Sequence, residues 1–335
     1  MAGKGDCTGA SEQIARKQAR ASGHPPLYAA MSREEFSERV SRAFGMLKEC
    51  SLCPRACGVD RTEGQRGFCR TLDKPFVSSW GPHFGEEPPL VGPHNMKAGS
   101  GAIFFGNCNL GCIFCQNWTI SHHRGGSDTA EGAEISTERL ASIMLELQDA
   151  GCHNINLVTP THQMPMILKA LGAAKDRGLA LPVVYNTGGY DSLEAVRLLS
   201  GIVDIYMPDF KYWDPEMAAK YSLARDYPET AKAAIREMHR QVGDLVIENG
   251  VAIRGLLLRH LVLPCGIAGT KDVVKFVSEE ISKNTYINIM DQYHPCFKAF
   301  EHPPLDRRIT EGEYEEAVRA ATEAGLRRIA GVTVQ

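Results

Sequence analysis

Residues 106–117 read Gly-Asn-Cys-Asn-Leu-Gly-Cys-Ile-Phe-Cys-Gln-Asn and place Cys108, Cys112 and Cys115 on one short stretch of chain. An apolar, β-prone run at residues 102–105 comes directly before it, which predicts a loop at the end of a strand. Three thiolates at this spacing can hold three corners of an iron–sulfur cluster, whose fourth ligand is typically another cysteine. No fourth cysteine follows at ferredoxin spacing, so one iron is expected to remain open for an exogenous ligand. The alternative is a structural zinc knuckle, which usually has C-x2-C pairs and four closed positions.

Strands and helices alternate around this loop from about residue 100 onward. The expected strands lie at residues 102–105, 155–158, 183–185, 202–207, 253–263 and 286–290, with a final one at 329–334. The expected helices run from Ser136 to Gly151, from Asp191 to Gly201, onward from Thr270, and from Thr310 to Gly325. This alternation predicts an α/β fold with a parallel sheet, either open and doubly wound or closed into a complete or partial barrel. In each of these folds, chemistry takes place beyond the carboxyl ends of the strands.

A second cysteine set lies upstream, in a Gly- and Pro-rich segment, with the spacing C-x2-C-x3-C-x11-C. It consists of Cys50, Cys53, Cys57 and Cys69. Four soft thiolates suit tetrahedral zinc and an iron–sulfur cluster about equally well, so both metals stay open. Four arginines crowd the same segment, namely Arg55, Arg61, Arg66 and Arg70. Glu86 and Glu87 lie between the two cysteine sets as candidates for an acid–base or amine-binding role, with a solvated carboxylate pair as the alternative.

Composition narrows the class of protein. The chain has 335 residues with 37 Lys and Arg against 40 Asp and Glu, a net charge of −3 that speaks against nucleic-acid or membrane-surface binding. No apolar run is long enough to span a bilayer, and no secretory signal is visible at the start. A cytoplasmic protein is therefore expected. Seven of the eleven cysteines fall between residues 50 and 115, which in a reducing compartment favours metal or redox chemistry over disulfides.

The cysteine loop resembles the hallmark of the radical S-adenosylmethionine superfamily, C-x3-C-x-aromatic-C, with Phe114 in the aromatic position. The resemblance covers about residues 100–295 and is nearest to the pyruvate formate-lyase activating enzyme branch, among uncharacterised members with an upstream cysteine cluster. It implies a partial (β/α)6-type TIM barrel with an N-terminal cysteine-rich extension. It also implies a [4Fe–4S] cluster whose open iron binds S-adenosylmethionine.

Some site residues follow from the resemblance, position by position. Asp209 and Lys211 match a D-x-K element that in this branch helps to hold the methionine carboxylate. Asn186 and Thr187 occupy the place of a D-T-N-G stretch, which with Asp209 can line a monovalent cation site. Because Asn186 replaces the expected Asp and removes a charge, that cation is in doubt.

Other positions depart further from the branch. Thr159 and Thr161 follow the second strand, where relatives carry a G-G-E segment that binds the amino group of the cofactor. Their hydroxyls are the expected substitutes. Arg259 resembles part of a later cofactor-supporting strand, and His294 falls where a histidine that contacts adenine is expected.

The predicted organisation is an arm and helix at residues 1–48, a four-cysteine metal-binding module at 49–97 and a radical S-adenosylmethionine barrel at 98–335. The resemblance implies an oxidoreductase of anaerobic chemistry that cleaves S-adenosylmethionine to a 5′-deoxyadenosyl radical, with reduced flavodoxin or ferredoxin as electron donor. Activation of a glycyl-radical enzyme is one expected outcome, and radical modification of a small molecule or peptide is the alternative. A non-catalytic iron–sulfur electron carrier or a zinc-stabilised interaction protein is the second alternative.

Overall fold

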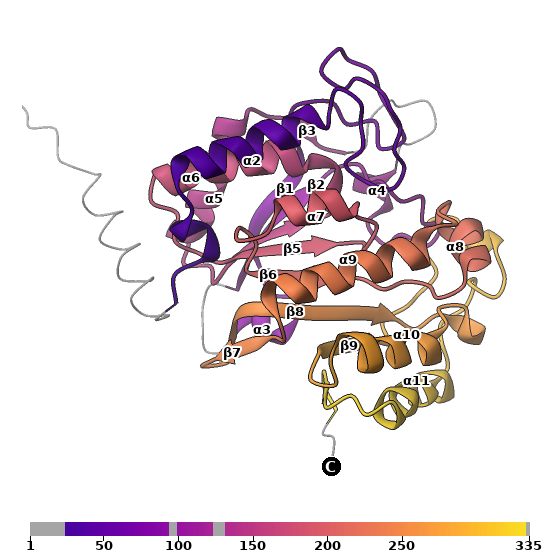
Figure 1. Ribbon diagram of the computed structural model, residues 1–335. Helices are drawn as coiled ribbons and strands as arrows, with labels where there is room; N and C mark the ends of the chain where they lie inside the picture. Colours follow the sequence, from indigo (N-terminus) through magenta and orange to yellow (C-terminus); the bar gives the residue numbers. More distant parts are fainter. Residues whose placement is uncertain (1–23, 94–98, 123–130, 333–335) are drawn as a thin grey trace, which may run out of the picture.

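The computed structural model describes residues 24–93, 99–122 and 131–332 (Figure 1). Its strands are β1 (Phe76–His83), β2 (Ser100–Phe105), β3 (Ala133–Glu134), β4 (Ile155–Val158), β5 (Val183–Thr187), β6 (Ile205–Pro208), β7 (Val246–Glu248), β8 (Val251–Leu261), β9 (Tyr286–Met290) and β10 (Arg328–Ile329). Within these residues the strands form one sheet of order β10-β9-β8-β6-β5-β4-β2-β1-β3, and β7 pairs with β8.

Six neighbouring strands, β2, β4, β5, β6, β8 and β9, run parallel to one another, which confirms the predicted α/β fold with a parallel sheet. Five of them contain most or all of a predicted run, and β6 contains half of the run predicted at 202–207. β1 pairs antiparallel with β2 and was not predicted, because residues 76–83 contain Gly, Pro and two Ser residues and acquire their strand geometry by pairing. The predicted strand at 329–334 was wrong in extent: β10 covers Arg328–Ile329, and residues 333–335 lie outside the described part of the chain.

The helices are α2 (Arg33–Gly45), α3 (Pro88–Val91), α4 (Trp118–Ser121), α5 (Thr137–Asp149), α6 (Met164–Asp176), α7 (Leu193–Leu198), α8 (Pro215–Ser222), α9 (Tyr227–Val242), α10 (Thr270–Phe276) and α11 (Glu311–Glu323). Short 3-10 turns occur at Leu27–Ala30, Thr161–Gln163, Pro264–Gly266 and Ala299–Glu301, and a π-helical turn at Val277–Ile281 follows α10. None of the helices in the described residues is long and apolar enough to cross a membrane.

Side-chain caps determine where several helices begin. Ser32 and Ser136 accept backbone N–H groups at the starts of α2 and α5, and Thr310 forms the predicted capping box with Glu313 at α11. The predicted start of α7 at Asp191 was wrong. Ser192 caps this helix, its first residue is Leu193, and Asp191 is buried.

Helices cover the parallel strands, whose residues are almost all buried. In Figure 1 α2, α5 and α6 lie together, and α10 and α11 lie beside β9. α2 packs on α6, so the N-terminal helix belongs to the same layer as the helices of the α/β unit. Residues 46–75 contain neither helix nor strand and form the dark violet loops beside α4 in Figure 1. The predicted arm at residues 1–23 lies outside the described residues.

Candidate active site

Cys108, Cys112 and Cys115 lie beyond the carboxyl end of β2, where the sequence places them. All three line a cavity of about 460 Å³. The ends of β4, β5, β6, β8 and β9 supply other parts of its wall, so the cavity lies at the edge of the sheet where parallel α/β folds bind their ligands. All three cysteines are free thiols.

Two serine hydroxyls hold the cysteine loop in place. The Ser222 hydroxyl, at the end of α8, donates to Cys112 Sγ at 2.9 Å. Ser121 Oγ, at the end of α4, lies 3.1 Å from Cys115 Sγ. Sequence reasoning missed both serines, because Ser222 is 110 residues from its partner and neither residue belongs to a recognisable motif.

Burial raises the pKa of the thiols of Cys108, Cys112 and Cys115, and the nearby Lys211 ammonium opposes this effect. Without a metal the thiols are therefore neutral at physiological pH. Ligand cysteines must lose their protons, so a metal group bound here displaces protons as it binds. Three soft sulfurs with a lysine beside them suit an anionic iron–sulfur cluster.

A charged network also lines the cavity, and its lysine is close enough to the cysteines to act on their thiols. Lys211 Nζ donates to Asp209 Oδ2 at 2.6 Å, and Arg259 Nε donates to Asp209 Oδ1 at 2.8 Å. The second guanidinium arm of Arg259 donates to Asn186 Oδ1 at 2.8 Å. Burial works against the Asp209 charge, but Arg259 and Lys211 outweigh it and hold the pKa of this carboxyl below its usual value. Two cations share one carboxylate, so the network carries a net positive charge that favours an anionic ligand.

The predicted threonines take different positions. Thr159 lines the cavity with a backbone φ of +62°, a strained geometry for a β-branched residue that occurs chiefly at functional sites. Thr161, which we expected at the cofactor, lies off the cavity wall. Its hydroxyl donates to Asp191 Oδ1 at 2.7 Å, and Thr187 donates to Asp191 Oδ2 at 2.6 Å. Thr161 thus supports Thr187, which lines the cavity, through a buried aspartate that the sequence did not single out.

Of the predicted aromatic and histidine positions, Phe114 lies at the cavity and His294 does not. Phe114 is only 6% exposed, lines the cavity and meets the rings of Tyr212 and Tyr293 edge to face. His294 does not line the cavity. Its Nδ1 lies 3.3 Å from the amide nitrogen of Gln116, which does, so His294 stands one residue away from the site.

Comparison with known proteins decides the family. Residues 102–262 match the Radical SAM superfamily model, a range that includes the cysteine loop and the Asp209 network. An uncharacterized protein of Methanocaldococcus jannaschii is 32% identical over 294 residues, which cover 86% of this chain and 78% of the relative. A second uncharacterized protein of the same organism is 23% identical over 292 residues, covering 84% and 79%. The chain belongs to the radical SAM superfamily.

A radical SAM domain implies a [4Fe–4S] cluster and S-adenosylmethionine, and the residues of the cavity fit both. Three thiols, that of Cys112 buried and the other two partly buried, offer the soft ligands of a cluster with one open iron. The positive network of Lys211 and Arg259 offers an anchor for a carboxylate. A cavity of about 460 Å³ is within the usual size of cofactor sites.

This radical SAM cavity also carries groups that neither cofactor explains. His83 and Glu86 both line it, with His83 Nδ1 3.2 Å from Glu86 Oε1. Glu87 is buried beside them and accepts a hydrogen bond from the Asn288 amide at 2.8 Å. Burial raises the pKa of Glu87, and the charge of Arg259 opposes this. Of the two glutamates that the sequence named as candidates, Glu86 therefore lines the cavity, whereas Glu87, the next residue along the chain, is buried and does not.

The four upstream cysteines also come together. They line one small pocket together with Arg61 and His162: Cys50, Cys53, Cys57 and Cys69. Burial raises the pKa of Cys53 to about 12. Across the residues described by the structure, no three His, Cys, Asp or Glu side chains are close enough to hold a single metal ion, in either cysteine set.

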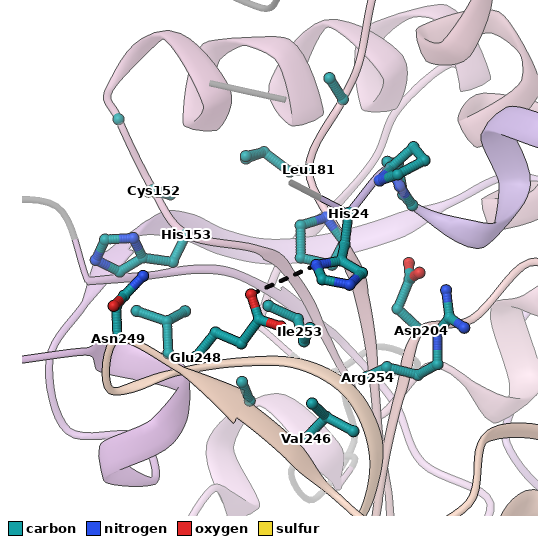
Figure 2. Close-up of a pocket in the computed structure, with 17 residues that line it drawn as sticks. His24, Cys152, His153, Leu181, Asp204, Val246, Glu248, Asn249, Ile253 and Arg254 are labelled. Carbon is teal, nitrogen blue, oxygen red and sulfur yellow. Dashed lines mark ion pairs between the residues drawn. The ribbon is translucent and has the colours of Figure 1, made fainter. Parts of the chain in front are cut away.

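A second large cavity, of about 470 Å³, lies at the amino ends of β4, β5 and β6 (Figure 2). In Figure 2 the ring of His24 and the carboxylate of Glu248 point toward one another, with His24 Nδ1 3.4 Å from Glu248 Oε2. Asp204 is 1% exposed there and accepts backbone N–H groups of Leu27 and Val183 at 2.8 and 2.9 Å. Burial raises the pKa of Asp204 to about 7.

Proposed function

We propose that this chain is a radical SAM enzyme that abstracts a hydrogen atom from its substrate. The observation that carries the proposal is that three cysteine thiols and a positive Asp209 network line one cavity at the carboxyl edge of the sheet. When bound, the [4Fe–4S] cluster supplies one electron to the sulfonium of S-adenosylmethionine, which yields methionine and the 5′-deoxyadenosyl radical that attacks the substrate.

The side chains that line the cavity are proposed to bind the cluster, to orient S-adenosylmethionine and to shield the radical from water. Cys108, Cys112 and Cys115 are the proposed cluster ligands. Lys211 and Arg259 offer more positive charge than Asp209 neutralises, so they are the proposed partners of the methionine carboxylate. Phe114 and the other apolar wall residues keep water away from a reactive radical, which is the part that a protein plays in such chemistry.

The finer assignments belong to the same proposal. We propose an incomplete (β/α)6-type barrel, a cytoplasmic location and reduced flavodoxin or ferredoxin as electron donor. The four upstream cysteines are proposed to hold a second metal site of zinc or iron and sulfide, because they share one pocket with a buried arginine. Thr159, Asn186 and Thr187 are the proposed neighbours of the cofactor, since each lines the cavity.

Two substrate classes remain candidates. In the first, a partner enzyme loses a hydrogen atom from a backbone glycine and gains a glycyl radical. In the second, the cavity takes a small molecule or a peptide side chain. His83 and Glu86 favour the second class, because a polar pair in the lining of the cavity can bind a polar substrate group.

The test uses the iron-reconstituted protein under anaerobic conditions with dithionite and S-adenosylmethionine. Formation of 5′-deoxyadenosine, measured by chromatography, supports the enzyme. A protein that binds no S-adenosylmethionine in calorimetry is instead an electron carrier or an interaction protein. A glycyl radical in a partner enzyme, seen by electron paramagnetic resonance, identifies the first substrate class, and deoxyadenosine that increases with an added metabolite or peptide identifies the second.

A further inference from the structure

The pocket of the four upstream cysteines contains two buried polar side chains with no obvious role in a module that only holds its loops together. These are Arg61 and His162, both about 1% exposed. Arg61 comes from the module itself, while His162 comes from the turn after β4 in the radical SAM domain. The pocket is thus built at the boundary between the two regions.

Arg61 is a buried cation without a carboxylate partner among the residues described. Its guanidinium donates to the carbonyl oxygen of Leu72 at 3.1 Å, and one nitrogen lies 3.9 Å from Cys50 Sγ. A buried charge with no counter-charge is strongly destabilising. A group of metal-bound thiolates carries net negative charge and compensates the guanidinium, so Arg61 indicates an anionic metal centre in this pocket.

His162 has one ring nitrogen engaged and one without a partner. Nε2 lies 2.9 Å from the carbonyl oxygen of Gly106, so this nitrogen carries the proton. Nδ1 is buried and, within the described chain, has no hydrogen-bond partner. Such an orphaned atom costs about 1–3 kcal/mol unless something else satisfies it. Because Nε2 carries the proton, Nδ1 presents a lone pair, which a metal ion or a donor hydrogen in this pocket can satisfy and a sulfur atom cannot.

Two hydrogen bonds connect the module to the loop of the first cysteine set, and a third connects that loop to His162, which lines the module's pocket. They are His162 Nε2 to Gly106 O at 2.9 Å, Asn107 Nδ2 to Thr71 Oγ1 at 3.0 Å, and Arg55 Nε to Asn109 O at 3.0 Å. Gly106, Asn107 and Asn109 all lie within two residues of Cys108. On the module side, Thr71 and Arg55 each lie two residues after a cysteine of the set. Short paths of covalent and hydrogen bonds therefore run between the two cysteine sets.

We propose that Cys50, Cys53, Cys57 and Cys69 hold a redox-active iron–sulfur cluster that delivers electrons to the cluster of Cys108, Cys112 and Cys115, with His162 as a positioning residue between them. This deepens the proposed function and rests on it for the use of the electron. A zinc ion passes no electrons, and a module that zinc merely stabilises has no need of links to the loop around Cys108.

The electron balance is simple. One electron passes from a reduced flavodoxin or ferredoxin to the upstream cluster, and the carrier is oxidised by one electron. The same electron then passes to the first cluster, and the upstream cluster returns to its oxidised state. The module lies at the surface, where Phe68 is 39% exposed beneath the guanidinium of Arg55, so a carrier protein can approach it.

The first experiment counts metals in the full chain after anaerobic reconstitution. We expect about eight irons per chain, by elemental analysis and Mössbauer spectroscopy, and no zinc. Cys57→Ala is expected to lose about half of the iron, and Cys265→Ala, an exposed cysteine outside both sets, is expected to lose none. About four irons together with one zinc in the wild-type protein overturns the proposal.

The second experiment measures electron delivery, with a variant that leaves all seven ligands in place. In His162→Ala, reduction of the first cluster by reduced flavodoxin, followed in a stopped-flow absorbance experiment, is expected to slow by about tenfold or more. Reduction by dithionite, a small reductant that needs no relay, is expected to be unchanged. His162→Gln, whose amide can still donate to Gly106 O, is expected to restore much of the rate. Equal flavodoxin rates in wild type and His162→Ala contradict the relay.

These outcomes are separable from those of the proposed function. Eight irons and a fast flavodoxin reaction without any deoxyadenosine mean that the proposed function is wrong and the relay is correct. Deoxyadenosine formation with four irons and a zinc means the reverse.

Discussion

Two cavities of nearly equal volume, about 460 and 470 Å³, lie at opposite edges of the same parallel strands. The cavity at the carboxyl edge has three cysteine thiols and a paired ionic network. The cavity at the amino edge (Figure 2) has, among the described residues, an ion pair between two half-exposed side chains, His24 and Glu248. Volume alone does not distinguish them. The direction of the strands and the chemistry of the side chains do.

The two edges also differ in how they affect the pKa of an aspartate, as a comparison of Asp209 with Asp204 shows. Burial raises the pKa of both carboxyls, but at Asp209 the cations Arg259 and Lys211 reverse the effect and lower it. At Asp204 backbone N–H groups and a more distant Arg254 compensate less, and the pKa stays raised at about 7. The side chains at the carboxyl edge therefore stabilise the charged form of Asp209, whereas those at the amino edge favour the neutral form of Asp204.

The largest expected effect comes from removing a cysteine at the carboxyl edge. Cys108→Ala is expected to lose about four irons and all formation of 5′-deoxyadenosine, since a [4Fe–4S] cluster depends on its cysteine ligands. Cys152→Ala, in the wall of the other cavity, is the matched control and is expected to keep both. Iron analysis and product chromatography measure the outcome, and full iron in Cys108→Ala contradicts the site.

The next largest effect concerns the aspartates themselves. Asp209→Asn leaves Lys211 and Arg259 without their counter-charge and is expected to lower the free energy of unfolding by about 3 kcal/mol. It is also expected to weaken S-adenosylmethionine binding, since the two cations lose their orientation. Asp204→Asn keeps one acceptor oxygen and is expected to cost about 1 kcal/mol. Urea unfolding measures the two losses of stability, and calorimetry measures S-adenosylmethionine binding. A larger loss of unfolding free energy in Asp204→Asn than in Asp209→Asn contradicts the difference between the two edges.

A smaller effect depends on pH. The folded-state pKa of Asp204 is raised above the unfolded value, so the folded protein binds more protons between about pH 4 and pH 7. The contribution of this group to stability is therefore fully present below pH 4 and is lost as the pH rises through 7. The difference in unfolding free energy between wild type and Asp204→Asn should fall over this range, and a flat difference from pH 4 to pH 8 contradicts the raised pKa.

The smallest effect is expected at the rim of the amino-edge cavity. Glu248→Gln breaks the His24–Glu248 pair, whose side chains are 52% and 40% exposed. Exposed pairs contribute about 0–1 kcal/mol, so the melting temperature should hardly change. A large loss of stability would mean that this cavity depends on the pair.

The strand and cysteine patterns could be predicted from the sequence because both are local. Apolar runs identify the six parallel strands, and the spacing of Cys108, Cys112 and Cys115 places the thiols on one loop. Contacts between distant residues could not be predicted in this way. Thr161 turned out to support Thr187 through Asp191, and Ser222 contacts Cys112 across 110 residues, because only the packing of α7 and α8 brings them there.

The most direct test of the account is electron paramagnetic resonance of the dithionite-reduced protein with and without S-adenosylmethionine. If Cys108, Cys112 and Cys115 hold a cluster with one open iron, S-adenosylmethionine is expected to change its spectrum, and the change is expected to be weaker in Asp209→Asn. The same spectrum with and without S-adenosylmethionine, in a protein that carries its full iron, contradicts the account.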